Sequence, residues 1–350
     1  MVRPRHLFFS RSFVAKSFCD AREGPPTAEA ALSEAVERLR AACVPDAEAS
    51  AGWLLAHVLG STTMSAVDVA VAEGSHLTEL QAGRFRAFVA RRETREPTQY
   101  IVGKWAFYDI EVEVRPPVLV PRPETEELVD LILKWWFSDI SRRSRPARFL
   151  DVGCGSGCIG LALLQHLPRG SECLGIDISQ EALSLANHNG LQLVDRRCKS
   201  YEVKERSAAV PRPRSEKPYD FIVSNPPYIP TCDLKGLEPE VRHFEDPRAL
   251  DGGDDGLDVA RHILDQAPTY LDPKSTRTLW LELDTSHPLT LPNEINKKRP
   301  TKASSFHNSQ QMRLDASFKD ANENSRFAKI LFDTTAPSSS SSEHLGEETT

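Results

Sequence analysis

The feature that most constrains the fold is a repeated pattern of apolar segment, turn and amphipathic segment in the middle of the chain. Residues 149–167 predict a strand, a glycine turn and a helix, and residues 173–189 predict a strand, an acidic turn and a helix. Repeated units of this kind imply parallel strands with helices packed on both faces of the sheet. The apolar residues 221–223 predict a further buried strand. We therefore expect an α/β fold with a doubly wound sheet.

Composition narrows the class of protein. The 350 residues, 40% hydrophobic and 27% charged, indicate two folded units plus tails. The formal net charge of −7 argues against duplex DNA as the main partner. No apolar run approaches the roughly 20 residues of a membrane span, so we expect no membrane partner. The seven cysteines include no C-x-x-C pair, which favours a reducing compartment and no metal site.

The first nineteen residues carry four basic and no acidic residues, with Leu, Phe and Val interleaved. This composition is typical of a mitochondrial transit segment and predicts a location in the mitochondrial matrix. The alternative is an unstructured basic tail. In either case residues 1–26 are excluded from the fold.

The remaining chain divides into segments that differ in hydrophobic spacing and in composition. Leu32, Val36 and Leu39 recur at helical spacing, and Asp46 stands at the start of a second apolar helix as a predicted cap. Two polar, basic stretches are interpreted as insertions, the first being either a solvated loop or a contact for an RNA-rich partner. The predicted boundaries are 27–96 for a small helical domain, 97–115 for a linking hairpin, 116–333 for the α/β domain with insertions near 196–217 and 292–311, and 334–350 for a disordered tail.

Three predicted strand ends carry the residues suited to a ligand. The first is a G-x-G-x-G turn with Gly153, Gly155 and Gly157, where the backbone can approach a ligand closely. The second strand ends at Asp177, about twenty residues downstream, where a Rossmann-like fold places a carboxylate on ribose hydroxyls. The third ends in Asn225-Pro-Pro-Tyr228, because two prolines stop a strand. The first two ends together predict a pocket for an adenosine group.

With the Asn-Pro-Pro-Tyr corner added, the chain resembles class I S-adenosylmethionine-dependent methyltransferases that act on planar nitrogen. An amide nitrogen has a delocalised lone pair, so such a site must hold the N–H groups and direct the lone pair at the methyl carbon. The Asn225 side-chain oxygen and the Pro226 carbonyl are acceptors for this purpose, and Tyr228 packs against the planar group. In-line transfer from a sulfonium needs positioning and electrostatics rather than a separate nucleophile.

Four further segments narrow the resemblance to the HemK/PrmC-type protein-(glutamine-N5) methyltransferases. They are R-E-P-T-Q-Y-I-V-G-K-W-A-F from residue 95, L-V-P-R-P-E-T-E-E-L-V from residue 119, S-N-P-P-Y-I-P from residue 224 and A-L-D-G-G-D-D-G-L-D from residue 249. The resemblance covers roughly residues 27–290. It implies a small N-terminal helical domain that helps to hold a protein substrate. The implied reaction is methylation of the glutamine in the Gly-Gly-Gln loop of a class I peptide-chain release factor, here the mitochondrial one.

The resemblance also implies the site residues. The catalytic residues are Asn225, Pro226 and Tyr228. The substrate-binding residues are Asn225, Pro226, Pro227 and Tyr228. The residues that bind S-adenosyl-L-methionine are Asp151, Gly153, Cys154, Gly155, Ser156, Gly157, Asp177, Ile178 and Asn225. Glu124 and Thr125 match a family segment near the active site, without an assigned role.

Some points stay open at this stage. No residue is assigned to the adenine ring, because the basic stretch after residue 196 replaces the strand usual in the family. Glu282, Asp284 and His287 are interpreted as a solvated strand end rather than an acid/base triad. The alternatives in function are an N6-adenine or N2-guanine nucleic-acid methyltransferase, a ribosomal-protein glutamine methyltransferase and a catalytically silent binding relative. We expect no direct nucleic-acid binding, while proximity to the ribosome stays open.

Overall fold

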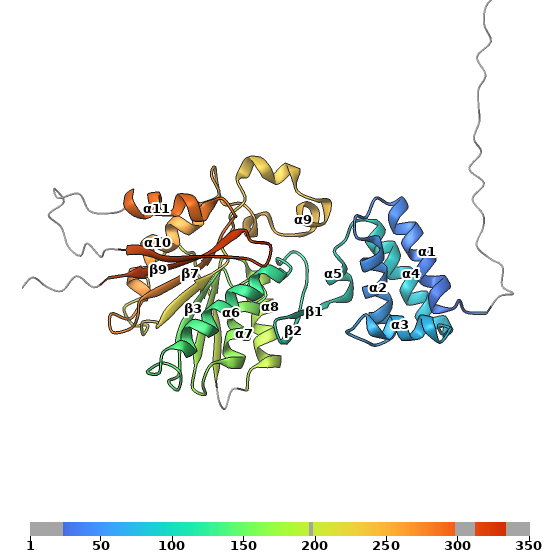
Figure 1. Cartoon of the computed structure of the whole chain (residues 1–350), viewed down its shortest axis with the longest axis horizontal. Helices are drawn as coiled ribbons and strands as arrows, with labels where there is room; N and C mark the ends of the chain where they lie inside the picture. Colours follow the sequence, from blue (N-terminus) through green and yellow to red (C-terminus); the bar gives the residue numbers. More distant parts are fainter. Residues whose placement is uncertain (1–23, 196–198, 298–311, 334–350) are drawn as a thin grey trace, which may run out of the picture. The chain divides into compact units, whose positions relative to one another are not determined.

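The computed structural model describes residues 24–195, 199–297 and 312–333, and it divides the chain into two compact units after Thr94 (Figure 1). Most of the predicted transit-like segment, the predicted tail and residues 298–311 of the second predicted insertion lie outside the described residues. None of the helices in the described ranges has the length and apolar composition that a membrane crossing requires.

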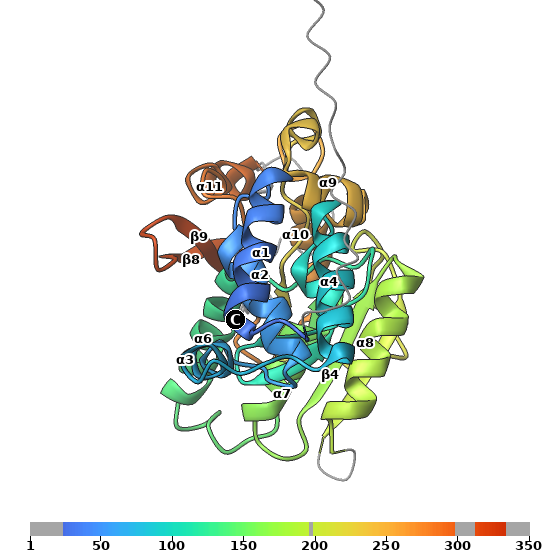
Figure 2. The same cartoon turned by 90° about the vertical axis from the view of Figure 1, so that its right-hand side faces the viewer.

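The first unit is helical in its described residues. Its helices are α1 (Ala28–Ala41), α2 (Ala47–Val58), α3 (Ser65–Ala72) and α4 (Glu79–Glu93). Both views show α1, α2 and α4 side by side (Figures 1 and 2). The Thr27 hydroxyl accepts from the N–H of Ala30 at the start of α1, and Thr78 forms a capping box with Gln81 at the start of α4. Leu39, Leu54 and other buried side chains then fill the space between the helices.

Asp46 precedes α2 as predicted, but its side chain does not cap the helix. Its carboxylate instead accepts from the Ser50 hydroxyl (3.0 Å) and pairs with the guanidinium of Arg92 (2.7 Å). Arg92 is 3% exposed, so this ion pair compensates a charge that α4 buries. Asp46 thus occupies the N-cap position as predicted, but its carboxylate pairs with a buried arginine instead of making a capping bond.

The second unit contains a seven-stranded sheet in the order β5-β4-β3-β6-β7-β9-β8. Its strands are β3 (Arg148–Val152), β4 (Glu172–Asp177), β5 (Ser200–Glu205), β6 (Phe221–Ser224), β7 (Thr278–Glu282), β8 (Met312–Lys319) and β9 (Ser325–Phe332). Strands β3 to β7 pair in parallel, which confirms the predicted fold class. Strand β9 is antiparallel to β7 and pairs with β8 in a closing hairpin. The carboxyl ends of β3, β4 and β6 therefore meet at one edge.

Helices cover both faces of this sheet. They are α6 (Pro123–Ser138), α7 (Cys158–His166), α8 (Gln180–Leu193), α10 (Asp258–Tyr270) and α11 (His287–Lys297). Apolar side chains of α6 and α7 pack on one face with Phe149 and Phe221, while those of α10 and α11 pack on the other with Leu150 and Ile222. Successive strand residues thus enter opposite cores, as expected for a parallel sheet buried on both faces.

Short elements connect the sheet to its surroundings. They are α5 (Thr98–Val102), β1 (Lys104–Phe107), β2 (Ile110–Glu113), η1 (Thr231–Gly236), α9 (Pro239–Phe244) and η2 (Pro247–Ala249). Strands β1 and β2 form an antiparallel hairpin, and the Asn189 side-chain oxygen on α8 accepts from the N–H of Glu113 (2.9 Å). The Arg95 guanidinium makes a two-bonded ion pair with Glu240 on α9 (both 2.6 Å). The hairpin thereby attaches to α8, and the start of the second unit attaches to α9.

An aromatic cluster lies under the sheet face that α6 covers. Phe149 and Phe221 stack at 4.9 Å between ring centroids. Trp135 meets Trp136, Phe221 and Trp280 edge-on at 5.6–5.9 Å. Edge-to-face pairs of this kind stabilise a core by about 1 kcal/mol each beyond the area buried. The cluster fixes β3, β6 and β7 behind the edge where their carboxyl ends meet.

The described parts of the two predicted insertions include regular secondary structure. Residues 200–205 of the first predicted insertion form β5, which pairs with the full length of β4. Residues 292–297 of the second predicted insertion continue helix α11. In both stretches charged and polar residues dominate the sequence, yet the neighbouring sheet supplies the packing partner.

Candidate active site

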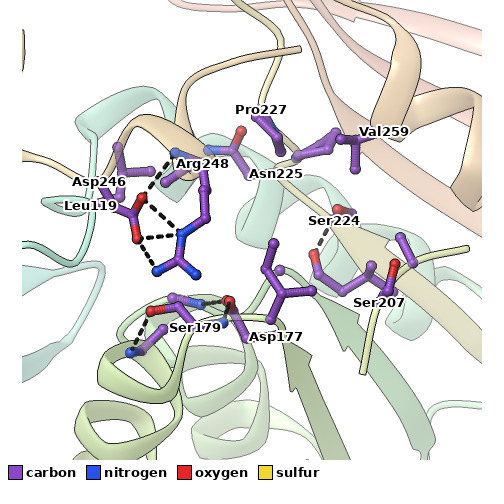
Figure 3. Close-up of a pocket in the computed structure, with 18 of the residues that line it drawn as sticks. Leu119, Asp177, Ser179, Ser207, Ser224, Asn225, Pro227, Asp246, Arg248 and Val259 are labelled. Carbon is purple, nitrogen blue, oxygen red and sulfur yellow. Dashed lines mark hydrogen bonds and ion pairs between the residues drawn. The ribbon is translucent and has the colours of Figure 1, made fainter. Parts of the chain in front are cut away.

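A cavity opens where the carboxyl ends of β3, β4 and β6 meet (Figure 3). The space between its walls, counted out to open solvent, is about 910 Å³. Open parallel sheets place their ligands at this edge. The lining residues are Val118, Leu119, Val152, Gly153, Gly155, Asp177, Ile178, Ser179, Ala182, Arg206, Ser207, Ala208, Ser224, Asn225, Pro226, Pro227, Asp246, Arg248, Ala249, Val259 and His262.

The glycine turn after β3 forms one wall. Gly153 and Gly155 have φ of +70° and +54°, a conformation that favours glycine. The N–H groups of Gly153 and Cys154 donate to the Ile176 carbonyl (2.8 and 3.1 Å), which ties the turn to β4. The turn therefore presents backbone rather than side chains to the cavity.

Asp177 ends β4 and connects this turn to the start of α8. Its Oδ2 accepts from the N–H of Gly155 (3.0 Å) and its Oδ1 accepts from the N–H of Ser179 (2.9 Å). Each carboxylate oxygen has further acceptor capacity. Because Asp177 is only partly buried, these lone pairs are available to hydroxyl groups of a ligand in the cavity.

The chain after β5 forms the next wall, which sequence reasoning missed. Arg206, Ser207 and Ala208 line the cavity, as do Val259 and His262 of α10. The Arg206 guanidinium pairs with Glu216 (2.9 Å), so its charge is compensated outside the cavity. Apart from this ion pair the wall is mostly uncharged and suits a flat, apolar ring. The alternation of Tyr201 and Val203 with charged residues was the available sequence signal for the strand that positions it.

Arg248 and Asp246 form the remaining wall, also missed from sequence (Figure 3). The two side chains form an ion pair (2.6 Å), and the N–H of Asp246 donates to the Pro117 carbonyl (2.7 Å). The Arg248 guanidinium holds the pKa of Asp246 below its ordinary value. This segment therefore keeps a fixed negative charge beside a positive one at the cavity mouth.

The Asn-Pro-Pro-Tyr corner begins where β6 ends. The buried Ser224 hydroxyl donates to the Val152 carbonyl (2.7 Å), which fixes β6 to β3 at this point. The Asn225 side-chain Nδ2 then donates to the Thr125 hydroxyl oxygen on α6 (3.1 Å). This bond orients the amide and leaves Oδ1 as its acceptor. Asn225, Pro226 and Pro227 all line the cavity.

The chain that follows the corner is hydrogen-bonded to a later segment. The N–H of Ile229 donates to the Leu250 carbonyl (3.0 Å), and the N–H of Gly252 returns a bond to the Ile229 carbonyl (2.8 Å). The structure thus brings the quoted segment from residue 249 beside the corner, although about 25 residues separate them in sequence.

Tyr228, predicted to bind the substrate, is not among the residues that line this cavity. Burial raises its pKa to about 12, so the phenol keeps its proton. Glu282 contributes to this shift, which places Tyr228 near the end of β7.

The interpretation of Glu282, Asp284 and His287 as a solvated strand end is wrong for two of the three. Glu282 is fully buried and His287 is 5% exposed. The three side chains do not form a triad: Asp284 accepts from Ser286 (2.7 and 2.9 Å), while His287 Nε2 contacts the Asp255 carbonyl (3.0 Å).

Four residues predicted to bind cofactor do not line the cavity: Asp151, Cys154, Ser156 and Gly157. Asp151 is fully buried, accepts from the N–H of Gly160 (3.1 Å), and has a pKa raised by burial to about 7. Burial also raises the pKa of the Cys154 thiol. These residues belong to the glycine turn and its surroundings but do not line the cavity.

Comparison with known proteins agrees with this arrangement. Residues 30–103 match the family model described as PrmC N-terminal domain, and residues 134–235 match the one described as Methyltransferase small domain. The chain is 39% identical to the human MTRF1L release factor glutamine methyltransferase over 256 residues, which are 70% of this chain and 72% of the relative. It is 40% identical to the release factor glutamine methyltransferase of Geobacter sulfurreducens over 230 residues, or 66% of this chain and 75% of that one. The chain therefore belongs to the family of release factor glutamine methyltransferases.

Proposed function

We propose that the chain transfers a methyl group from S-adenosyl-L-methionine to the glutamine amide of a peptide-chain release factor. The cavity fits this cofactor. Asp177 offers carboxylate lone pairs to ribose hydroxyls, and Ile178, Ala208 and Val259 offer apolar contacts to the adenine ring. The bare backbone at Gly153 leaves room for the remainder of the molecule beside the corner.

The observation that carries the proposal is the fixed amide of Asn225. Its Nδ2 is held by Thr125, so Oδ1 is the atom that accepts an N–H from a substrate amide. The Pro226 carbonyl supplies a second acceptor, because a glutamine amide has two N–H groups. This pair of acceptors distinguishes a planar amide from a hydroxyl or a thiol substrate.

The cofactor supplies a methyl group on a positively charged sulfur. The corner holds the glutamine nitrogen in the plane set by Asn225 and Pro226 and directs its lone pair at the methyl carbon. The N–C bond would form as the S–C bond breaks, with the neutral thioether S-adenosylhomocysteine as the leaving group, and the nitrogen would release one N–H proton to water. Orientation of this kind is worth several kcal/mol of the barrier.

The test is mass spectrometry of a class I release factor incubated with the full chain and S-adenosyl-L-methionine. We expect one added methyl group on the glutamine of the Gly-Gly-Gln loop. A release factor with that glutamine replaced by alanine is the matched control and should gain no methyl group.

The proposal is overturned when calorimetry shows bound cofactor but the release factor gains no methyl group. A methyl group found instead on adenine or guanine of added DNA or RNA would assign the corner to a nucleic-acid substrate. A methyl group on a ribosomal-protein glutamine alone would keep the chemistry and change the partner.

We also propose that the chain acts in the mitochondrial matrix on the release factor of that compartment. The support is the basic, apolar and acid-free composition of residues 1–19. A fluorescent protein fused after residue 26 should enter mitochondria and resist protease added to mitoplasts. Cytosolic fluorescence would contradict the location.

A further inference from the structure

A buried carboxylate lies under the Asn-Pro-Pro-Tyr corner and is not used by the mechanism above. Glu282 ends β7, the strand next to β6, and it is 0% exposed. Within the described residues neither of its carboxylate oxygens makes a hydrogen bond of good geometry, and the polar group that acts on it most strongly is the Thr125 hydroxyl. A buried, unpaired carboxylate costs several kcal/mol, so its presence calls for a role other than stability.

The charged groups around Glu282 do not neutralise it directly. The ionisable neighbours are Arg326 on β9, Arg122 before α6, Glu124 on α6, Tyr228 in the corner and Cys158 on α7. Arg326 is paired with Asp320 (3.1 Å), and Arg122 is paired with Glu245 (2.6 Å). Both cations are thus engaged elsewhere and act on Glu282 only through their field.

Thr125 connects Glu282 to the corner. Its side chain is 2% exposed, and its hydroxyl oxygen accepts from Nδ2 of Asn225 (3.1 Å). The same hydroxyl is close enough to Glu282 to lower the pKa of that carboxyl. A hydroxyl has one proton and two lone pairs. Since one lone pair accepts from Asn225, the proton is available to the carboxylate.

We propose that Glu282 is a positioning residue that holds the Thr125 hydroxyl proton and thereby sets the direction of the Asn225 amide. The inference rests on the proposed function, because the oriented amide is the acceptor for the substrate glutamine. With Glu282 ionised, Thr125 donates to it and accepts from Nδ2, so Oδ1 is held as the acceptor. With Glu282 protonated, its own O–H competes for the Thr125 oxygen, and the Thr125 proton turns toward Asn225. The amide then loses its fixed direction.

Protonation of Glu282 therefore makes methyl transfer depend on pH. Burial raises the pKa of Glu282 to about 7 from 4.5, while Thr125, Arg326 and Arg122 act in the opposite direction and Glu124 adds to the rise. The carboxylate is ionised above that pH and neutral below it. We expect kcat to fall as pH drops through about 7.

The experiment compares Glu282→Gln, Thr125→Val, the double variant and Thr125→Ser in the full chain. Glu282→Gln and Thr125→Val should each lower kcat about 10- to 30-fold, with KM for the release factor and cofactor affinity within about threefold. The double variant should lose no more than the single variants, because both act through one hydrogen-bonded chain. Thr125→Ser keeps the hydroxyl and should be about tenfold more active than Thr125→Val.

The pH profile supplies a readout that a structural role would not change. The fall in kcat below pH 7 should be present in the wild type and absent in Glu282→Gln. Unfolding provides a second readout without activity. An acid with a raised pKa stabilises the fold fully below its ordinary pKa and loses that contribution as pH rises through the raised value. The stability of Glu282→Gln relative to wild type should thus increase between pH 4.5 and 7.

Three results would overturn the inference: losses that multiply in the double variant, a pH step that persists in Glu282→Gln, or variants as active as wild type. A different result would contradict the proposed function itself rather than the role of Glu282. In that case the wild type binds cofactor without methylating the release factor, which is measured before any variant is compared.

Discussion

Asn225→Ala is expected to lower kcat about a thousandfold while cofactor affinity changes by less than about threefold. The side chain is at the cavity wall, held by the Thr125 hydroxyl, and it is the acceptor that holds the glutamine N–H. Removal of one oriented hydrogen-bonding group at a reacting centre costs about 10²- to 10³-fold in kcat. In this variant the lone pair of the substrate glutamine amide is also no longer directed at the methyl carbon.

Single-turnover methylation with saturating cofactor measures the chemical step for this variant. Asn187→Ala is the matched control. It removes the same kind of side chain, but Asn187 is exposed on α8 and is distant from the corner in sequence. The control should react at the wild-type rate. Near-wild-type kcat in Asn225→Ala would remove Asn225 from the mechanism.

Asp177→Ala is expected to weaken cofactor binding about 30- to 100-fold, as measured by titration calorimetry. Two effects add. The ribose hydroxyls lose a charged acceptor, and a hydrogen bond to a charged group contributes about 1.5–3 kcal/mol. The N–H groups of Gly155 and Ser179 lose the carboxylate that holds the glycine turn against α8.

Asp177→Asn separates these two effects. Its side-chain oxygen still accepts from one of the two backbone N–H groups, but the charge is gone. We expect an affinity between wild type and Asp177→Ala. Unchanged affinity in both variants would show that the cofactor does not use this carboxylate.

The residues predicted to form the site fall into two groups for a physical reason. Gly153, Asp177 and Asn225 were found because a glycine turn, an acidic strand end and a double proline are local signals. They line the cavity. Thr125 is separated from Asn225 by 100 residues, so no local pattern predicts their hydrogen bond. Only the packing of α6 on the sheet brings them together.

Strand β5 shows a different limit of prediction from sequence. It is an edge strand whose Glu202, Lys204 and Glu205 face away from the core, and charged residues are common on edges because they prevent pairing with other chains. Such a strand has the composition of a solvated insertion. Only two of its partly buried residues, Tyr201 and Val203, are apolar, which is too few to show the period clearly.

Glu282 shows the opposite limit. Carboxylates are rarely fully buried, so a strand that ends in one is expected to end in solvent. In the structure, β7 is a central strand, and all five of its residues are buried. The sequence contains no information on what covers the end of a strand. A functional carboxylate in that position is therefore visible only once the fold is known.

The clustering of tryptophans gives the two units separate optical labels. Trp53 is on α2 in the helical unit, while the second unit holds Trp105 on β1 and a cluster in which Trp135 lies within 6 Å of Trp136 and of Trp280. Indole rings this close exchange excitation energy, and the cation of Lys329 over two of them adds quenching. Emission from the cluster thus reports on the packing of β7 against α6, and emission from Trp53 reports on the helical unit. A Trp53→Phe variant leaves emission from the second unit alone, so its difference from wild type reports on melting of the helical unit.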